Sequence, residues 1–161
     1  MGKKQEYKLK NKEYLKELSK KEGVKPLSNG ILYEVIKEGS GEGTVSERSI
    51  VTCHYRGSLI SGQVFDDSWQ RGIPEAFRVN DLITGFQTAL CAMHKGDHWR
   101  VHIPYQEGYG TKRDGEIPGY STLILAALGK VEASFLCSRL RYFCRKYATL
   151  GKVSASFLSY C

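Results

Sequence analysis

The chain has 161 residues, 41% of them hydrophobic and 25% charged, a composition typical of one soluble globular domain with short appendages. Its net charge of +7 lies at the two ends: residues 1–26 and 133–161 each carry +5, whereas residues 27–132 carry −3. A face that binds nucleic acid is normally part of the folded domain, so this distribution argues against nucleic acid as a partner. No apolar run approaches the ~20 residues of a membrane span.

The cysteines and the N-terminal residues favour the cytoplasm. Five cysteines, none of them in a C-x-x-C pair, are typical of free thiols in a reducing compartment. The first residues are charged and are not followed by an apolar segment, so no secretory signal is expected.

The first expected element is a short amphipathic helix over residues 11–23. Asn11 would cap its N-terminus and Gly23 would end it. Its narrow apolar stripe would consist of Tyr14, Leu15 and Leu18. A linker around Pro26 would follow. The helix is either a solvated, lysine-rich appendage or a surface that contacts a second copy or a client protein.

From Ile31 onward the hydrophobic period becomes that of a strand. Strands are expected over residues 31–38, 50–56 and 98–103. Residues 82–93 carry apolar side chains at helical spacing, and Gly96 would end this helix. Several strands and one central helix predict an α+β domain, in which an antiparallel sheet packs on the helix.

No familiar motif for metal, cofactor or nucleophile chemistry is present. His98 and His102 would stand ~13 Å apart along a strand, on its solvated face, which does not suit two ligands of one metal. The glycines between 39 and 43 lack the spacing of a dinucleotide fingerprint, and no serine lies in a nucleophile elbow. We therefore expect no metal and no cofactor.

Aromatic residues crowd a stretch of about fifty residues, from Tyr55 to Tyr109. Most such residues fill cores. Several of these, however, lie beside polar or glycine-containing loops, where a ligand pocket could open.

A series of short motifs resembles the FKBP family of peptidyl-prolyl cis/trans isomerases, in the family's order, from Leu32 to about Leu125. The motifs are Val51–Leu59, Gly62–Ser68, Arg71–Pro74, Leu82–Phe86, Met93–Asp97, Ile103–Tyr105, Tyr109–Gly110, Ile117–Pro118 and Ser121–Ile124. The preceding helix and linker are similar to the extensions of the bacterial, macrophage infectivity potentiator group of this family.

The resemblance implies an α+β fold, an antiparallel half-barrel sheet wrapped around one short α-helix, with an N-terminal helical extension. Residues 1–29 would form this basic extension and its linker, and residues 30–132 the isomerase domain. Residues 133–161, which do not resemble the family, would form a basic tail of unknown structure, for which disorder is one alternative. The last strand of the domain also departs from the family pattern after Ile124, which predicts a weakened domain.

The resemblance also implies the residues of a proline-binding pocket. Its catalytic residues would be Tyr55, Asp66 and Tyr109. Its substrate-binding residues would be Phe65, Arg71, Phe77, Leu82, Ile83, Phe86, Ile117 and Leu125. Phe86 would form the floor, where most members have Trp. Asp66 would face the substrate carbonyl, and the Ile83 N–H and the Tyr109 hydroxyl would donate hydrogen bonds to the substrate.

The implied function is acceleration of X-Pro bond rotation in unfolded or partly folded proteins. The alternative is a proline-binding chaperone or interaction module with little or no turnover. Macrolide-type inhibitors would bind the same pocket. We expect neither nucleic acid nor membrane as a partner, and a monomer or weak dimer.

Overall fold

The computed structural model describes residues 2–132, with side chains up to Leu128, so the tail predicted for residues 133–161 lies outside the described residues. The strands are β1 (Val24–Pro26), β2 (Leu32–Lys37), β3 (Ile50–Leu59), β4 (Val64–Asp67), β5 (Glu75–Arg78), β6 (His98–Ile103) and β7 (Leu123–Glu132). The α-helices are α1 (Lys3–Leu18), α2 (Ser68–Arg71) and α3 (Thr84–Ala92), and the short 3-10 helices are η1 (Ser28–Gly30), η2 (Val79–Asp81) and η3 (Tyr105–Glu107).

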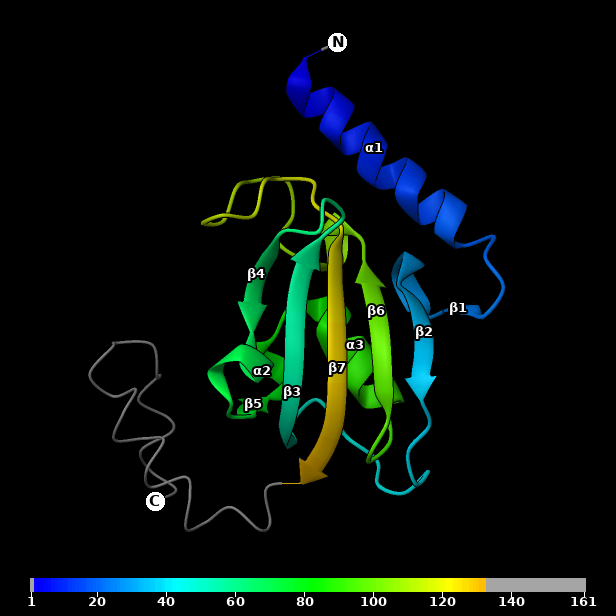
Figure 1. Ribbon diagram of the computed structural model, residues 1–161, viewed down its shortest axis with the longest axis vertical. Coiled ribbons are helices and arrows are strands. Elements are labelled where there is room, and N and C mark those ends of the chain that lie inside the picture. The colour runs from blue at the N-terminus through cyan, green and yellow to red at the C-terminus, as the bar shows by residue number, and fades with distance from the viewer. Residues whose placement is uncertain (1, 133–161) are drawn as a thin grey trace, which may run out of the picture. The chain divides into compact units, whose positions relative to one another are not determined.

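The strands form one sheet in the order β1-β2-β6-β7-β3-β4, with β5 paired to β3. The pairs β1–β2, β2–β6, β6–β7, β3–β4 and β3–β5 are antiparallel. The sheet covers α3, which lies behind it in Figure 1. The predicted α+β architecture is therefore confirmed, including the sheet packed on one short helix and the N-terminal helix.

The core lies between the inner face of this sheet and α3. Along β3, Val51, Cys53 and Tyr55 are buried and alternate with half-buried residues, as the period of two predicts. The helix contributes Phe86 and Leu90 to the same core. Burial raises the pKa of the Cys53 thiol to about 12, so this cysteine behaves as a packing residue rather than a nucleophile.

The last strand forms in spite of its departure from the family pattern. Leu123, Leu125 and Ala127 are buried and alternate with half-buried neighbours. They pair with β6 in regular antiparallel register, with Ala127 opposite Trp99. The alternation of side chains thus survives, while the predicted loss of stability stays a prediction.

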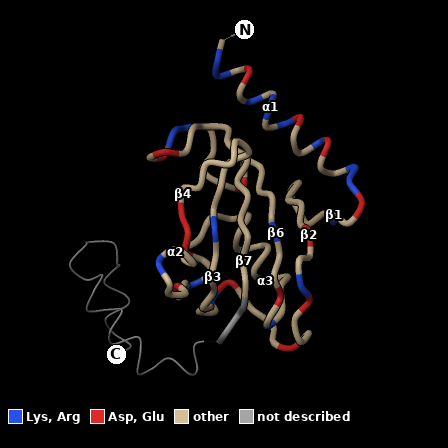
Figure 2. The backbone as a smooth tube through the Cα atoms, viewed as in Figure 1, with Lys and Arg blue, Asp and Glu red and all other residues tan. Residues whose placement is uncertain are grey.

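The N-terminal helix is longer than predicted and begins earlier in the chain than the predicted start at Asn11. It begins at Lys3, and Asn11, expected as its cap, lies in its middle, 2% exposed. Residues 3–10 contain no helix breaker and several good helix formers. The Asn11 side chain donates to the Tyr7 carbonyl of the same helix and accepts from the Thr122 N–H. The lysines of α1 are prominent in Figure 2. Its buried side faces the domain, so α1 is docked and is not a solvated appendage.

His102 on β6 is another correction, because this histidine was expected on a solvated face. It is 2% exposed, and its Nδ1 lies 3.1 Å from the hydroxyl of Tyr14 on α1. Its Nε2 lies 3.5 Å from a carboxylate oxygen of Glu34. The docked helix covers this part of the sheet, which a strand pattern alone does not reveal.

The burial of His102 predicts a loss of stability in mild acid. Burial lowers the pKa of His102 from 6.5, although Glu34 opposes the effect, and Arg100 and Lys21 lower it further. The unfolded chain therefore takes up the proton first, so this stability is complete above about pH 6.5 and is lost as the pH falls. Urea unfolding at about pH 7.5 and pH 5.5 should show a smaller acid loss for His102→Gln than for wild type. His98, whose pKa is also lowered by burial and by the nearby Arg100 charge, is expected to contribute to the acid loss that remains in His102→Gln. An equal acid loss in both proteins would contradict the assignment to His102.

Candidate functional site

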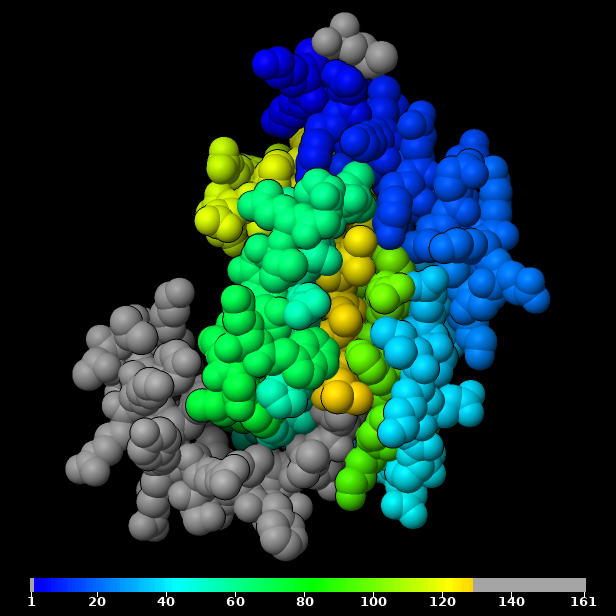
Figure 3. Space-filling model, in the orientation of Figure 1, coloured from blue at the N-terminus to red at the C-terminus, as the bar shows by residue number. Residues whose placement is uncertain are grey.

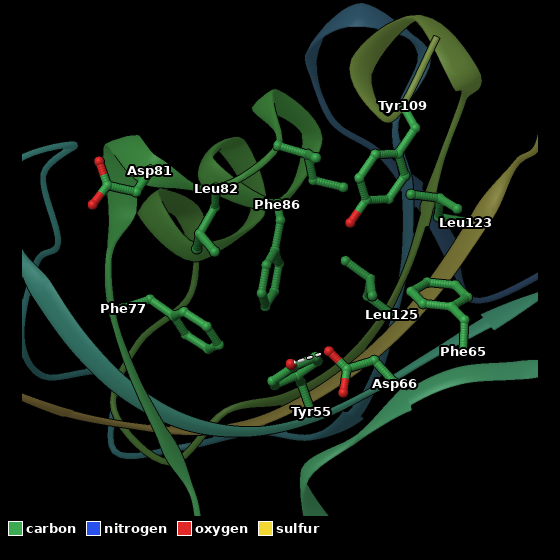
Figure 4. A pocket seen from close by; sticks show the side chains of 11 residues that line it. Tyr55, Phe65, Asp66, Phe77, Asp81, Leu82, Phe86, Tyr109, Leu123 and Leu125 are labelled. Carbon is green, nitrogen blue, oxygen red and sulfur yellow. Dashed lines mark hydrogen bonds between the residues drawn. The ribbon is translucent and has the colours of Figure 1, made fainter. Parts of the chain in front are cut away.

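A cavity of about 290 Å3 opens between the sheet and the N-terminal end of α3. Its volume is near the lower end of the ~300–1,000 Å3 range typical of ligand pockets. Figure 4 shows aromatic and aliphatic side chains turned toward it. The lining residues are Tyr55, Phe65, Asp66, Phe77, Asp81, Leu82, Ile83, Phe86, Tyr109, Leu123 and Leu125. Such a cavity suits a small apolar ring.

The walls come from elements that are fixed by local sequence. Gly57 of β3 allows the Phe65 ring to approach the sheet, because a Cβ on Gly57 would lie 2.5 Å from that ring and 3.2 Å from Leu125. The floor residue Phe86 is 3% exposed and comes from the first turn of α3. Leu82 and Ile83 immediately precede this helix.

The segment β4–α2 positions the polar rim. The Asp67 carboxylate accepts a hydrogen bond of 3.1 Å from the Gln70 N–H and thereby caps α2. It also accepts a 2.7 Å bond from Arg56. This cap fixes the turn between Asp66, the residue before the last of β4, and Arg71, at the end of α2, so that their side chains meet.

Both carboxylate oxygens of Asp66 accept hydrogen bonds. Its Oδ2 accepts a hydrogen bond from the Tyr55 hydroxyl, and its Oδ1 accepts one of 2.5 Å from Nη1 of Arg71. Arg71 also lies across the Tyr55 ring, 5.9 Å from its centroid. The carboxylate therefore has one orientation at the mouth of the cavity.

Glu75, at the start of β5, completes this network and was not predicted. Its Oε1 accepts a hydrogen bond from Arg71, and its Oε2 lies 3.4 Å from the Tyr55 hydroxyl. Two carboxylates thus share one guanidinium. In the sequence Glu75 looks like any surface glutamate. Its spacing of four residues from Arg71 would predict a contact only if both residues lay in one helix, but α2 ends at Arg71.

The network keeps its donors protonated. Burial raises the pKa of Tyr55, as do its hydrogen bond to Asp66 and the negative charges of Glu75 and Asp66. Although desolvation acts in the opposite sense, the hydrogen bond to Asp66 and the neighbouring acidic groups raise the pKa of Arg71. Near neutral pH, Tyr55 is therefore a neutral hydroxyl and Arg71 a cation.

Tyr109 stands on the opposite side of the cavity, and Figure 4 shows its hydroxyl turned inward. The residue is 40% exposed. Partial burial and the negative charges of Asp114 and Asp66 raise its pKa, so the hydroxyl is a donor near neutral pH. Together, apolar walls, a fixed carboxylate and an inward hydroxyl can hold a ring and bind a carbonyl oxygen beside it.

The structure brings the predicted site residues together, with two exceptions. Arg71 touches Asp66 and Tyr55 without lining the cavity, and Ile117 is buried in the adjacent core, 6% exposed. Two lining residues were missed by the sequence reasoning, Asp81 of η2 and Leu123 of β7. Leu123 follows the alternation of the last strand and could have been found from it, whereas Asp81 carries no distinguishing signal.

Neither a metal centre nor a membrane span is seen within residues 2–132. In that part of the chain no three His, Cys, Asp or Glu side chains gather as metal ligands. Its longest helices are too short or too polar to cross a bilayer.

Known proteins resemble both the sequence and the fold. The chain is 40% identical over 116 residues to the FKBP-type peptidyl-prolyl cis-trans isomerase FkpA of Buchnera aphidicola subsp. Schizaphis graminum, covering 72% of this chain and 46% of the relative. It is 43% identical over 113 residues to the FKBP-type 22 kDa peptidyl-prolyl cis-trans isomerase of Escherichia coli, covering 69% of this chain and 54% of the relative. The chain thus spans about half the length of these curated relatives.

Solved structures and a family model agree with these relatives. The crystal structure of FkpA from Escherichia coli matches with a TM-score of 0.73 at 34% identity, over 79% of this chain and 59% of that chain. A peptidyl-prolyl cis-trans isomerase from Pseudomonas syringae matches with a TM-score of 0.74 at 28% identity, over 81% and 96%. The family model described as FKBP-type peptidyl-prolyl cis-trans isomerase matches residues 41–126, more than half of the sequence. The chain therefore belongs to the FKBP-type peptidyl-prolyl cis-trans isomerase family.

Proposed function

We propose that this protein is a peptidyl-prolyl cis/trans isomerase that accelerates rotation about X-Pro bonds in protein clients. The observation that carries the proposal is the aromatic cavity with the fixed Asp66 carboxylate at its mouth. The cavity lies within the segment matched by the family model.

The chemistry needs no covalent step by the protein. An X-Pro bond rotates over a barrier of ~18–20 kcal/mol because amide resonance is lost in the twisted state. The planar amide has more charge separation than the twisted amide, so water stabilises the planar form more strongly. A cavity that replaces water with Phe77, Phe86 and Leu125 therefore lowers the barrier by favouring the twisted state.

The polar groups would orient the substrate in this cavity. The proline ring would rest on Phe86, while the carbonyl before it would turn between Asp66 and the Tyr109 hydroxyl. The Ile83 N–H, at the N-terminal end of α3, would bind the backbone on the other side of the proline. Preorganised groups of this kind act without rearranging during the reaction. Macrolide-type inhibitors would compete for the same cavity.

The second candidate is a proline-binding chaperone or interaction module with little turnover. Apolar side chains on the surface support it, since Ile73 is 58% exposed and Val64 44% exposed. Exposed apolar side chains can bind unfolded segments without any isomerisation.

A protease-coupled assay with a Leu-Pro tetrapeptide separates the two candidates. Isomerisation predicts a cis-to-trans rate proportional to protein concentration and suppressed by a macrolide that fills the cavity. The binding module predicts that the peptide binds while the rate stays at its uncatalysed value. The cytoplasmic location and the state of monomer or weak dimer stay predictions, to be tested by cell fractionation and analytical ultracentrifugation.

A further inference from the structure

A strained turn joins the loop beside the cavity to the last strand. Its residues are Tyr120, Ser121 and Thr122, which directly precede β7. Tyr120 has φ of 68°, a left-handed conformation that a tyrosine adopts only when its surroundings enforce it. The preceding position requires glycine for a different reason, because a Cβ on Gly119 would lie 2.2 Å from the Thr111 carbonyl oxygen.

This turn is directly connected to two residues that line the cavity, Tyr109 and Leu123. The Tyr120 N–H donates a 2.9 Å hydrogen bond to the carbonyl of Gly110, the residue after Tyr109. The Ser121 hydroxyl donates a 2.7 Å bond to the carbonyl of Pro118. Thr122 is followed by Leu123, which lines the cavity. A shift of the turn would therefore move two of the cavity's walls.

The N-terminal helix holds every residue of this turn. The Oδ1 of Asn11 accepts a 2.7 Å hydrogen bond from the Thr122 N–H. The hydroxyls of Tyr7 and Ser121 lie 2.8 Å apart. The ammonium groups of Lys4 and Lys8 lie 5.3 and 5.0 Å from the centroid of the Tyr120 ring. Figure 3 shows α1 packed against the loop that ends in this turn.

The contact through Asn11 is the most specific of these. The side chain is 2% exposed, and its Nδ2 donates a 2.9 Å bond to the Tyr7 carbonyl, which fixes the amide with its oxygen toward Thr122. Burial of a side-chain amide lowers the stability of the fold unless both its oxygen and its nitrogen are hydrogen-bonded. Asn11 and Thr122 are 111 residues apart in the chain, so the bond between them ties α1 to the start of β7.

We propose that α1 sets the geometry of the cavity wall, with Asn11 and Tyr7 as positioning residues that act through the Tyr120–Thr122 turn on Leu123 and Tyr109. This inference rests on the proposed function for its kinetic consequence. It assigns to α1, which lies outside the matched family segment, a part in binding and turning the X-Pro bond.

A matched pair of hydroxyl deletions tests the proposal in the full chain. Tyr7→Phe removes the contact to the turn, whereas Tyr14→Phe removes a hydroxyl from the same helix that contacts His102 of the sheet. Asn11→Ala removes the hydrogen bond between α1 and the Thr122 N–H. With the Leu-Pro tetrapeptide, we expect kcat/KM to fall about tenfold for Asn11→Ala and about threefold for Tyr7→Phe, and by less than twofold for Tyr14→Phe.

Three further readouts separate positioning from general stability. Amide hydrogen exchange at Thr122 should accelerate in Asn11→Ala, and the affinity for the Leu-Pro peptide should fall in the same order as kcat/KM. The midpoint temperature of thermal unfolding should fall to a similar extent in Tyr7→Phe and Tyr14→Phe. If Asn11→Ala does not fold, the two tyrosine variants still decide the question.

The proposal is overturned if Tyr7→Phe and Tyr14→Phe change kcat/KM and peptide affinity equally, or if a folded Asn11→Ala leaves both unchanged. A wild-type chain without any isomerase activity would refute the proposed function instead. The order of peptide affinities, measured from the NMR shifts of Tyr109 and Leu123, would then decide whether α1 positions the wall.

Discussion

Replacing Asp66 with alanine is expected to lower kcat/KM for an X-Pro peptide by about tenfold or more, because the carboxylate at the cavity mouth is lost. The same change leaves Tyr55 and Arg71 without the acceptor that fixes them. The protein should remain folded, since the Asp66 and Arg71 side chains are 36% and 41% exposed and such ion pairs contribute little to stability. The protease-coupled assay and thermal unfolding measure the two effects.

Asp81→Asn is the matched control for this prediction. Asp81 lines the same cavity, so its replacement removes a nearby negative charge while the Asp66 network stays intact. A loss of activity as large as that of Asp66→Ala would show that overall charge matters and not the held carboxylate. Wild-type kcat/KM in Asp66→Ala would remove Asp66 from the mechanism altogether.

Replacing Phe86 with alanine should have the largest effect on the folded state. The ring is 3% exposed, lies in the main core, and contacts the Tyr55 ring at a centroid distance of 6.2 Å. Truncation of a buried phenylalanine costs about 3–5 kcal/mol of unfolding free energy, a large share of the ~5–15 kcal/mol of a typical domain. Chemical denaturation should therefore show a much lower midpoint. The Leu-Pro peptide should also bind more weakly, because the ring on which its proline would rest is gone.

Phe86→Trp tests the same position in the opposite direction. It introduces the tryptophan that the family resemblance implies at this position, with a larger ring and an indole N–H. We expect tighter binding of the Leu-Pro peptide than in wild type, measured by fluorescence titration or NMR. Weaker binding, with the fold unchanged, would show that this cavity is shaped around phenylalanine.

Local patterns in the sequence predicted the elements whose side chains alternate over enough residues. β3 and β6 follow the period of two, and α3 follows helical spacing, so the sheet and its central helix could be predicted. β4 and β5 have four residues each, which is too short for any period to be distinctive. The pocket residues came from a resemblance spread over many short motifs, since no single motif identifies the cavity.

Contacts between distant parts of the chain account for what the sequence could not predict. Asn11 looks like a helix cap because asparagine is common there, yet its partner is Thr122, 111 residues away. His102 looks like a solvated strand residue until α1 covers it. Glu75 joins Asp66 only because α2 and β5 fold Arg71 between them. Each of these positions depends on tertiary packing, which overrides the local preference.

Exchange spectroscopy by NMR on a Leu-Pro peptide tests the central claim most directly, because it detects turnover at the peptide bond without a coupling protease. With a small amount of the full chain, we predict exchange cross peaks between the cis and trans signals of the peptide. They should weaken strongly with Asp66→Ala and vanish when a macrolide occupies the cavity. Peptide binding at the Tyr109 and Leu123 signals without any cis–trans cross peaks would contradict the account and leave a proline-binding module.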